Sequence, residues 1–558
     1  MISLMYVDRA LEACLYSDNK PSRRVLGWVL AAVFGAALCV MIWLGPTPIS
    51  GPWDVVSFLN GSWRMCSGQI PHIDYHNPVG PLTYLQIVFG MKIAGPSTAA
   101  FVYGIVLAAV VLIPWAWGVA SSRLQPMVAF IYVLFCGFLL ISPRPLGYGV
   151  RETTYAMLYN RECYVLLSVL LVGLFLPRRA LAGHAAMFDG LSIGLLLALM
   201  LYCKITYFGV AAASTLLGIV LTRRPLVWFF GVAAGFLGVC VAFYILFHIN
   251  LRAYLSDIAM SAQSQSPAMR IELLKQGLRN NLLWIYLAFV CLCFWTYVDQ
   301  SSPKSPRSSF RLWLTAAWIL TIALCVEAGN AAQRGGVEDP IYFVAGLVVL
   351  ESFRRRNWEQ MQAMKSQARL MHAASVLLVL SLFCLPILAR DIASFSYSSA
   401  WNLVRRPSFD ASRRIRAGPL RDLLVPASTQ HITEYWPARD FPLRINEGLD
   451  LLRRHLSKGD TVTVMGFTDP FSFALGITPA RDENQWWHLD FTFDRRNHPS
   501  PTQFLGSVSL VVVPRNFDNV QGRGFENVDA MLEIYGNYLQ ANFAQVDSSE
   551  AWSLYRRR

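Results

Sequence analysis

The chain has 558 residues, of which 54% are hydrophobic and only 15% are charged, and its formal net charge is +13. A water-soluble protein of this length does not carry so much apolar sequence, so the composition excludes the soluble globular class and indicates a membrane protein. The basic residues occur in short clusters between apolar runs rather than along one stripe, which argues against nucleic acid as a partner.

About eleven apolar runs approach or exceed the length that crosses a hydrocarbon core of about 30 Å as a helix. We predict spans at residues 25–44, 98–120, 126–142, 163–176, 189–203, 205–222, 226–248, 281–298, 311–328, 339–353 and 371–389. Residues 1–24 precede them as a cytoplasmic tail, and residues 25–390 form one α-helical polytopic membrane domain. The chain is therefore expected to interact with the lipid bilayer along most of its length.

The distribution of basic residues predicts the orientation of these spans. Every second loop is basic: the clusters are Arg23 and Arg24, Arg123, Arg178 and Arg179, Arg223 and Arg224, Lys304 and Arg307, and Arg354, Arg355 and Arg356. By the positive-inside rule these loops are cytoplasmic. An odd number of spans then places the N-terminus on the cytoplasmic side of the cell inner (cytoplasmic) membrane. Everything after about residue 390 then lies on the extracytoplasmic side.

The outer C-terminal segment divides into two parts. Residues 391–440 are rich in Arg and Pro without clear periodicity, which indicates a juxtamembrane linker. Residues 441–558 alternate helix-like and strand-like stretches, and we predict a small extracytoplasmic α/β domain there. Its signals are an amphipathic run at Leu449, Leu452 and Leu456, strands at 461–465 and 508–513, and a helical run at 531–539. No nucleotide-binding motif accompanies them.

The first outer loop, residues 45–97, is far longer than the connection of two spans requires, and long loops of this kind are usually functional. It contains a partly apolar stripe that suits a helix lying in the membrane interface: Trp53, Val56, Phe58, Leu59 and Trp63. Asp54 lies at the start of this stripe, near the bilayer surface. The sequence leaves two interpretations open for Asp54, a general base and a helix N-cap.

The same loop contains the segment PHIDYHNP, with Asp74 and His76 as candidate substrate-binding residues. Asp74 also suits a turn before Pro78, which is the simpler interpretation. His72 and His76 are four residues apart, a spacing that suits a metal on a helix, but Pro71 and Pro78 oppose a helix here. We assign no metal ligands.

The second outer loop carries charges of both signs next to apolar runs. Glu152 and Glu162 are candidate catalytic or acceptor-orienting carboxylates, and Arg161 is a candidate for binding phosphate. Ordinary ion pairs of Glu152 with Arg151, and of Glu162 with Arg161, explain the same residues without a site.

Two further cations face the predicted outer side. Lys204 lies between the fifth and sixth spans, and Arg334 lies in a Gly-rich loop between the ninth and tenth. An ammonium at the centre of a membrane helix costs about 2.5–3.5 kcal/mol and less near its end, so Lys204 needs an anion or a route to water. Binding of a lipid phosphate meets this need, and so does snorkelling to the headgroups.

Together, the long first loop with its membrane-proximal Asp, the stretch GQIPHIDYHNPVGPLTYL, the Lys after the fifth span and the outer C-terminal domain resemble GT-C glycosyltransferases. This class includes protein O-mannosyltransferases and the lipid A aminoarabinose transferase. The resemblance covers the membrane part and is strongest over residues 50–90. The paired Asp-Glu often seen in this loop is absent, because Val55 follows Asp54. This departure leaves the identity of the base, and any need for a divalent metal, open.

The resemblance implies transfer of a sugar, with inversion, from a polyprenyl-phosphate donor to a hydroxyl of an envelope glycan, lipid or protein on the outer face of the membrane. It implies catalytic roles for Asp54, Glu152 and Glu162, donor-phosphate binding by Lys204, Arg161 and Arg334, and substrate binding by Asp74 and His76. A transporter or flippase of lipid-linked glycans, a glycan polymerase or ligase, and a non-catalytic sensor or assembly subunit remain alternatives.

Overall fold

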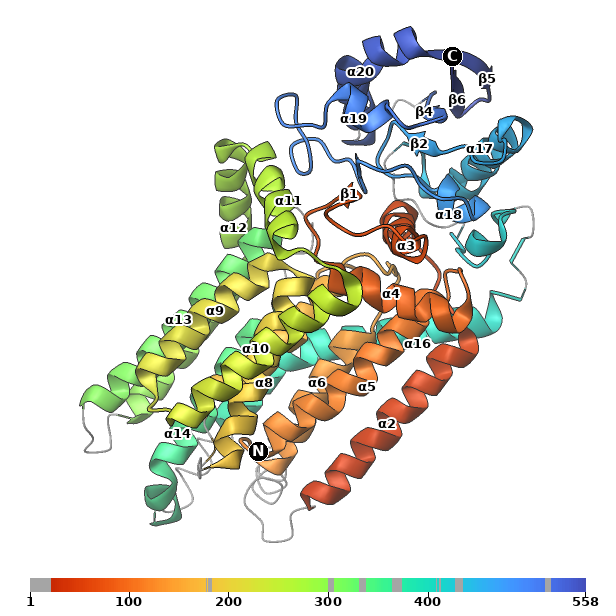
Figure 1. Ribbon diagram of the computed structural model, residues 1–558. Helices are drawn as coiled ribbons and strands as arrows, with labels where there is room; N and C mark the ends of the chain where they lie inside the picture. The colour runs from red at the N-terminus through yellow and green to blue at the C-terminus, as the bar shows by residue number, and fades with distance from the viewer. Residues whose placement is uncertain are drawn as a thin grey trace.

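The computed structural model describes residues 22–176, 178, 183–299, 306–330, 338–363, 374–407, 409–410, 413–426, 435–516 and 523–558. A bundle of long helices forms one part of the molecule, and a smaller C-terminal region covers one end of it (Figure 1). The helices of the bundle and its connections are α2 Arg23–Leu44, α3 Pro52–Cys66, α4 Pro81–Ala94, α5 Ala100–Ser121, α6 Pro126–Ile141, α7 Leu158–Phe175, α8 His184–Cys203, α9 Ile205–Leu221, α10 Leu226–Phe247, α11 Leu251–Ser264, α12 Pro267–Asp299, α13 Pro306–Asn330, α14 Ile341–Ala363 and α16 Leu385–Val404.

Six helices of the described chain are long and apolar enough to cross a membrane by length and composition: α2, α5, α7, α8, α10 and the stretch Ala374–Val404, which includes α16. Shorter apolar helices lie at Pro126–Ile141, Ile205–Leu221, Trp313–Gly329 and Ile341–Ser352. Each range predicted as a span falls largely within a helix. The chain is thus a helical membrane protein, while the number of eleven spans stays a prediction.

Three helical segments differ from the expectation. Helices α4 and α11 were not predicted, because neither is long and apolar enough to stand out as a span. Helix α16 continues to Val404, so the first part of the expected linker is helical. Its side chains hold the start of the first outer loop: Ser398 accepts a hydrogen bond from Thr47 (2.8 Å), and the Asn402 amide donates to the Pro46 carbonyl (2.9 Å).

At one end of the bundle, arginines from three separate loops converge on one buried carboxylate. Arg123 pairs with Asp189, and the guanidinium nitrogens of Arg224 and Arg178 lie 3.6 and 3.9 Å from the Asp189 oxygens. Arg355 donates a hydrogen bond to the Arg123 carbonyl. Four of the basic clusters that the sequence assigns to one side of the membrane therefore lie together.

Helices α8 and α10 pack backbone against backbone through glycines. Gly190 and Gly194 of α8 face Gly231 and Gly235 of α10, and a Cβ on Gly190 would lie 2.0 Å from the Trp228 carbonyl oxygen. Because lipid provides no hydrophobic drive between helices, close approach over small residues is a main source of their association. This contact fixes α10, most of whose surface faces outward, and thereby the α11 helix that follows it.

The C-terminal region contains a four-stranded sheet in the order β2-β4-β6-β5, with β2 parallel to β4 and the other pairs antiparallel. Its elements are α17 Phe441–His455, β2 Val462–Val464, α18 Phe471–Leu475, β3 Glu483–Asn484, α19 Pro501–Leu505, β4 Leu510–Pro514, α20 Arg523–Asn542, β5 Phe543–Ser548 and β6 Trp552–Arg557. The predicted elements at 449–456, 461–465, 508–513 and 531–539 correspond to α17, β2, β4 and α20. The hairpin β5–β6 was not predicted.

The first outer loop is joined to the C-terminal region by backbone pairing. Strand β1 (Tyr75–His76) runs parallel to β3, with Tyr75 opposite Glu483. The Trp53 ring of α3 packs edge-on against the rings of Tyr435 and Phe441, at centroid distances of 4.9 and 5.0 Å. Helix α3 is almost wholly buried beneath the C-terminal region (Figure 1), while its predicted position in the membrane interface stays a prediction.

We predict that Gly194→Leu destabilises the protein by at least about 1–3 kcal/mol, the usual cost of overpacking. A Cβ at this position would lie 2.1 Å from the Val232 carbonyl oxygen, a backbone atom that cannot turn aside. Gly238→Leu on α10 is the matched control, since no atom lies within 4 Å of a Cβ there. Thermal unfolding in detergent measures both variants, and equal midpoints would contradict the packing described here.

Candidate active site

Asp54 lies in the first turn of α3, at the outer end of the bundle. The helix begins after Gly51 with Pro52 at its first position, so Asp54 is not the N-cap that the sequence left open. Its carboxylate is half-buried, and no hydrogen bond or ion pair to it is found within the described part of the chain. Burial raises the pKa of Asp54 to about 6. Asp54 is therefore a carboxylate without a partner among the described residues, and burial brings its pKa closer to neutral pH.

Lys204 occupies the break between α8 and α9. Its backbone is extended (φ −156°, ψ 121°), and it ends one helix while it caps the next. The ammonium nitrogen donates a hydrogen bond to the Asn160 side-chain oxygen (3.0 Å) and lies 5.2 Å from the centroid of the Tyr159 ring. The helix break thus directs a cation towards the start of α7.

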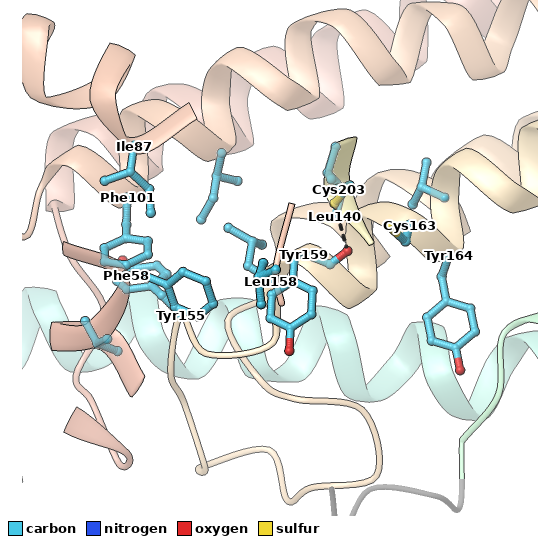
Figure 2. Close-up of a cluster of buried hydrophobic side chains, with 14 of the residues drawn as sticks. Phe58, Ile87, Phe101, Leu140, Tyr155, Leu158, Tyr159, Cys163, Tyr164 and Cys203 are labelled. Atoms are coloured by element: carbon cyan, nitrogen blue, oxygen red, sulfur yellow. Dashed lines mark hydrogen bonds between the residues drawn. The ribbon is translucent and has the colours of Figure 1, made fainter. Parts of the chain in front are cut away.

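Tyr159 is the residue that connects Asp54 with Lys204. The Phe58 ring, one turn after Asp54 on α3, lies 5.6 Å from the Tyr159 ring. Figure 2 shows Tyr159 between Phe58 and Cys203, whose thiol lies 3.6 Å from the Tyr159 carbonyl oxygen. The α3 turn that follows Asp54 and the Lys204 ammonium of the α8–α9 break therefore lie against the same tyrosine of α7.

The two glutamates of the second outer loop lie in different surroundings. Glu162 is enclosed in the bundle at 1% exposure, where one carboxylate oxygen accepts a hydrogen bond from Gln86 (3.0 Å). Its other oxygen has no partner among the described residues. Glu152 is half-buried in a tight turn, where its N–H donates to the Gly149 carbonyl (3.1 Å). Among the described residues, Glu162 forms no ion pair with Arg161, the pair that the sequence suggested as an alternative.

Arg161 binds the protein itself instead of lining this site. Its guanidinium donates to the carbonyls of Leu139 (2.6 Å) and Arg144 (2.7 Å) and to the Asp391 carboxylate on α16 (2.7 Å). Arg144 completes the network with bonds to Asp391 (2.9 Å) and Glu338 (2.7 Å). Because these partners take up the guanidinium donors, the network fixes α7 to α16. Arg334 lies outside the described residues.

Asp74 and His76 also contact protein groups. The Asp74 carboxylate accepts hydrogen bonds from the Ile70 N–H (2.7 Å) and the Arg481 guanidinium (2.9 Å), so it stabilises a turn over residues 70–74. His76 Nδ1 lies 2.9 Å from an oxygen of Asp257 on α11. The segment around both residues is not helical, as Pro71 and Pro78 predicted.

Sequence reasoning missed three residues of this region. Tyr159 and Asn160 open a buried helix, and a Tyr-Asn pair at the start of an apolar run was the one available signal. Asp257 is a single acid in an amphipathic helix and gave no signal at all. Within the described ranges, no group of three or more His, Cys, Asp or Glu side chains could hold a metal ion.

No protein-family model matches the sequence, and no curated protein matches it either. Solved structures similar to this chain include ArnT from Cupriavidus metallidurans bound to undecaprenyl phosphate, with 12% sequence identity and a TM-score of 0.45 over 95% of this chain and 98% of that one. The apo state of the same protein gives 13% identity and a TM-score of 0.46, over 95% and 97% of the two chains.

Proposed function

We propose that this protein is a membrane glycosyltransferase that moves a sugar from a polyprenyl-phosphate donor to an acceptor hydroxyl. The observation that carries the proposal is that α3, through Phe58 one turn after Asp54, and the Lys204 ammonium both lie against the ring of Tyr159. Such a transfer needs a carboxylate to accept the proton of the acceptor and a cation to bind the phosphate. Asp54, which has no partner among the described residues, and Lys204, at the α8–α9 break, are proposed to be these two groups.

In the proposed reaction, Asp54 accepts the proton of the acceptor hydroxyl while the hydroxyl oxygen forms a bond to the anomeric carbon. The bond from that carbon to the phosphate oxygen breaks, and its electron pair stays on the phosphate. Attack opposite the leaving group inverts the anomeric carbon. The products are the glycosylated acceptor, polyprenyl phosphate and a protonated Asp54, which releases its proton to solvent.

The raised pKa of Asp54 suits the role of a general base. A base acts best when its pKa lies close to the working pH, because it is then ionised yet still holds a proton well. With a pKa of about 6, Asp54 is ionised at neutral pH and is a stronger base than an exposed aspartate. Its position in the first turn of α3 also sets it near the positive end of the helix dipole.

Lys204 is proposed to bind the donor phosphate and to stabilise the negative charge that grows on it as the glycosidic bond breaks. The Asn160 side chain and the Tyr159 ring fix the direction of the ammonium. The buried Glu162 is proposed to orient the acceptor. Arg161 is not proposed to bind the donor phosphate, because its guanidinium is already bound in the network with Arg144 and Asp391.

The site is proposed to face the outer side of the cytoplasmic membrane. The arginines that converge on Asp189 mark the opposite, cytoplasmic end by the positive-inside rule. The C-terminal region that covers α3 then lies outside the membrane and covers the site on its extracytoplasmic side. The acceptor is a component of the cell envelope that reaches this face.

We predict that Asp54→Asn lowers the rate of sugar transfer by about 10² to 10⁴, the usual contribution of a general base. Burying an ionised carboxylate is unfavourable, so the amide does not lower the stability of the fold. Transfer from a labelled polyprenyl-phosphate-sugar pool to envelope acceptors measures the rate. Asp529→Asn, which changes an exposed carboxylate on α20, is the control, and equal rates in all three proteins would remove Asp54 from the mechanism.

The pH dependence of kcat/KM gives a separate prediction. Below a pH of about 6 Asp54 is protonated and cannot accept a proton, so kcat/KM falls tenfold for each further pH unit, and above that pH it reaches a plateau. The residual activity of Asp54→Asn lacks this limb. A wild-type limb centred near pH 4, where an exposed aspartate titrates, would contradict the burial of this group.

A further inference from the structure

Helix α11 carries a buried aspartate that binds the first outer loop. Asp257 is 5% exposed, and its two oxygens accept three hydrogen bonds. The donors are His72 Nδ1 (2.8 Å), His76 Nδ1 (2.9 Å) and the Asn77 N–H (3.1 Å). We call these four residues, His72, His76, Asn77 and Asp257, the α11 clamp. It joins parts of the chain about 180 residues apart.

The charges in the clamp strengthen it. Burial tends to raise the pKa of Asp257, but the hydrogen bonds from His72 and His76 outweigh burial and lower it, so the carboxylate stays ionised. The hydrogen bond to Asp257 raises the pKa of His76 against the effect of burial, and the nearby charge of Asp482 raises it further. Because the Asp257 carboxylate is ionised, the His76–Asp257 contact is a charge-assisted hydrogen bond.

The clamp leads directly to the chain segment that precedes Lys204. The Asn77 side chain accepts a hydrogen bond from the Val79 N–H (2.9 Å), and the Gly80 N–H donates to the Cys203 carbonyl (3.0 Å). The contact is so close that a Cβ on Gly80 would lie 2.0 Å from the Tyr202 carbonyl oxygen. Residues 77–80 are therefore fitted against the end of α8 without spare room.

Helix α11 also holds the end of α8 directly. The Tyr254 hydroxyl, one turn before Asp257, donates to the Leu201 carbonyl (3.0 Å), and the Tyr254 ring lies 4.7 Å from the His72 ring. Tyr254 is fully buried. The carbonyls of Leu201 and Cys203 are thus bound on both sides of Tyr202, one by α11 and the other through the clamp.

We infer that Asp257 is a positioning residue for donor binding: through the α11 clamp it fixes the break between α8 and α9 from which the Lys204 ammonium reaches the donor phosphate. This inference rests on the proposed function. Asp257 contacts neither Lys204 nor the reacting atoms, and it acts only by holding residues 77–80 against the end of α8. Loss of the clamp therefore weakens donor binding and leaves the basicity of Asp54 unchanged.

The test compares Asp257→Asn with Ser256→Ala, a change at an exposed position of the same helix, in the full-length protein. Hydrogen exchange of peptides covering residues 72–80 needs no substrate, and it reports the Asn77 and Gly80 amides directly. Transfer assays give KM for the donor, kcat and the pH profile. We expect Asp257→Asn to speed exchange in this segment and to raise KM about tenfold, with kcat and the limb near pH 6 little changed. Ser256→Ala leaves all of these as in wild type.

A double-variant cycle separates the clamp from a general loss of stability. If His76 and Asp257 act as one unit, Asp257→Asn combined with His76→Ala raises KM little more than the stronger single change. If they act independently, the two fold-changes multiply, and the clamp is overturned. Unchanged exchange in Asp257→Asn, or faster exchange with an unchanged KM, overturns the inference too. If the wild type transfers no sugar from any donor, the proposed function fails and the positioning role with it, while the exchange result still reports the contact itself.

Discussion

The buried guanidinium of Arg64 is the contact on which the outer half of the molecule depends. Arg64 closes α3 and is fully buried, where it donates to Gln69 (3.1 Å) and the Ala480 carbonyl (2.5 Å) and pairs with Glu483 of β3. Burial lowers the pKa of Arg64 to about 10 although the charge of Asp469 opposes this shift. A buried charge left without its partner costs about 3–5 kcal/mol. The C-terminal region and α3 therefore fold as one unit, and Asp54 lies at the other end of that helix.

The proposed site thus draws on two independent supports. The C-terminal region fixes Asp54 through α3, and α11 fixes the α8–α9 break through Asp257 and Tyr254. Strand β1 belongs to both, because Tyr75 and His76 pair with β3 while the His76 side chain binds Asp257. The glycine contact between α8 and α10 extends the second support into the bundle. Asp54, the proposed base, and Lys204, the proposed phosphate-binding cation, are in this way held by different parts of the chain that meet at one short strand.

The sequence predicted the features that depend on local residue patterns, namely the positions of most helices and of one helix break. Apolar runs located the helices, the stripe from Trp53 to Trp63 located α3, and the position of Lys204 between two runs located a helix break. It could not predict which charges would meet across the fold. Arg161 looked like a free cation because its partner Asp391 lies 230 residues further along, and His76 looked like a substrate ligand because Asp257 lies in a helix without a spanning signal. Periodicity reports which face of an element is buried, and it carries no information on its distant partner.

The central claim is that Lys204 binds the donor phosphate while Asp54 acts only as the general base. Direct binding of polyprenyl phosphate tests this claim most directly. Lys204→Met keeps the length of the side chain and removes the charge, while Asp54→Asn removes only the proposed base. Titration of each purified protein with polyprenyl phosphate, without an acceptor, measures Kd. We expect Lys204→Met to weaken binding about tenfold or more, since hydrogen bonds to charged groups are worth roughly 1.5–3 kcal/mol, and Asp54→Asn to leave it unchanged. Equal binding by wild type and Lys204→Met would contradict the account.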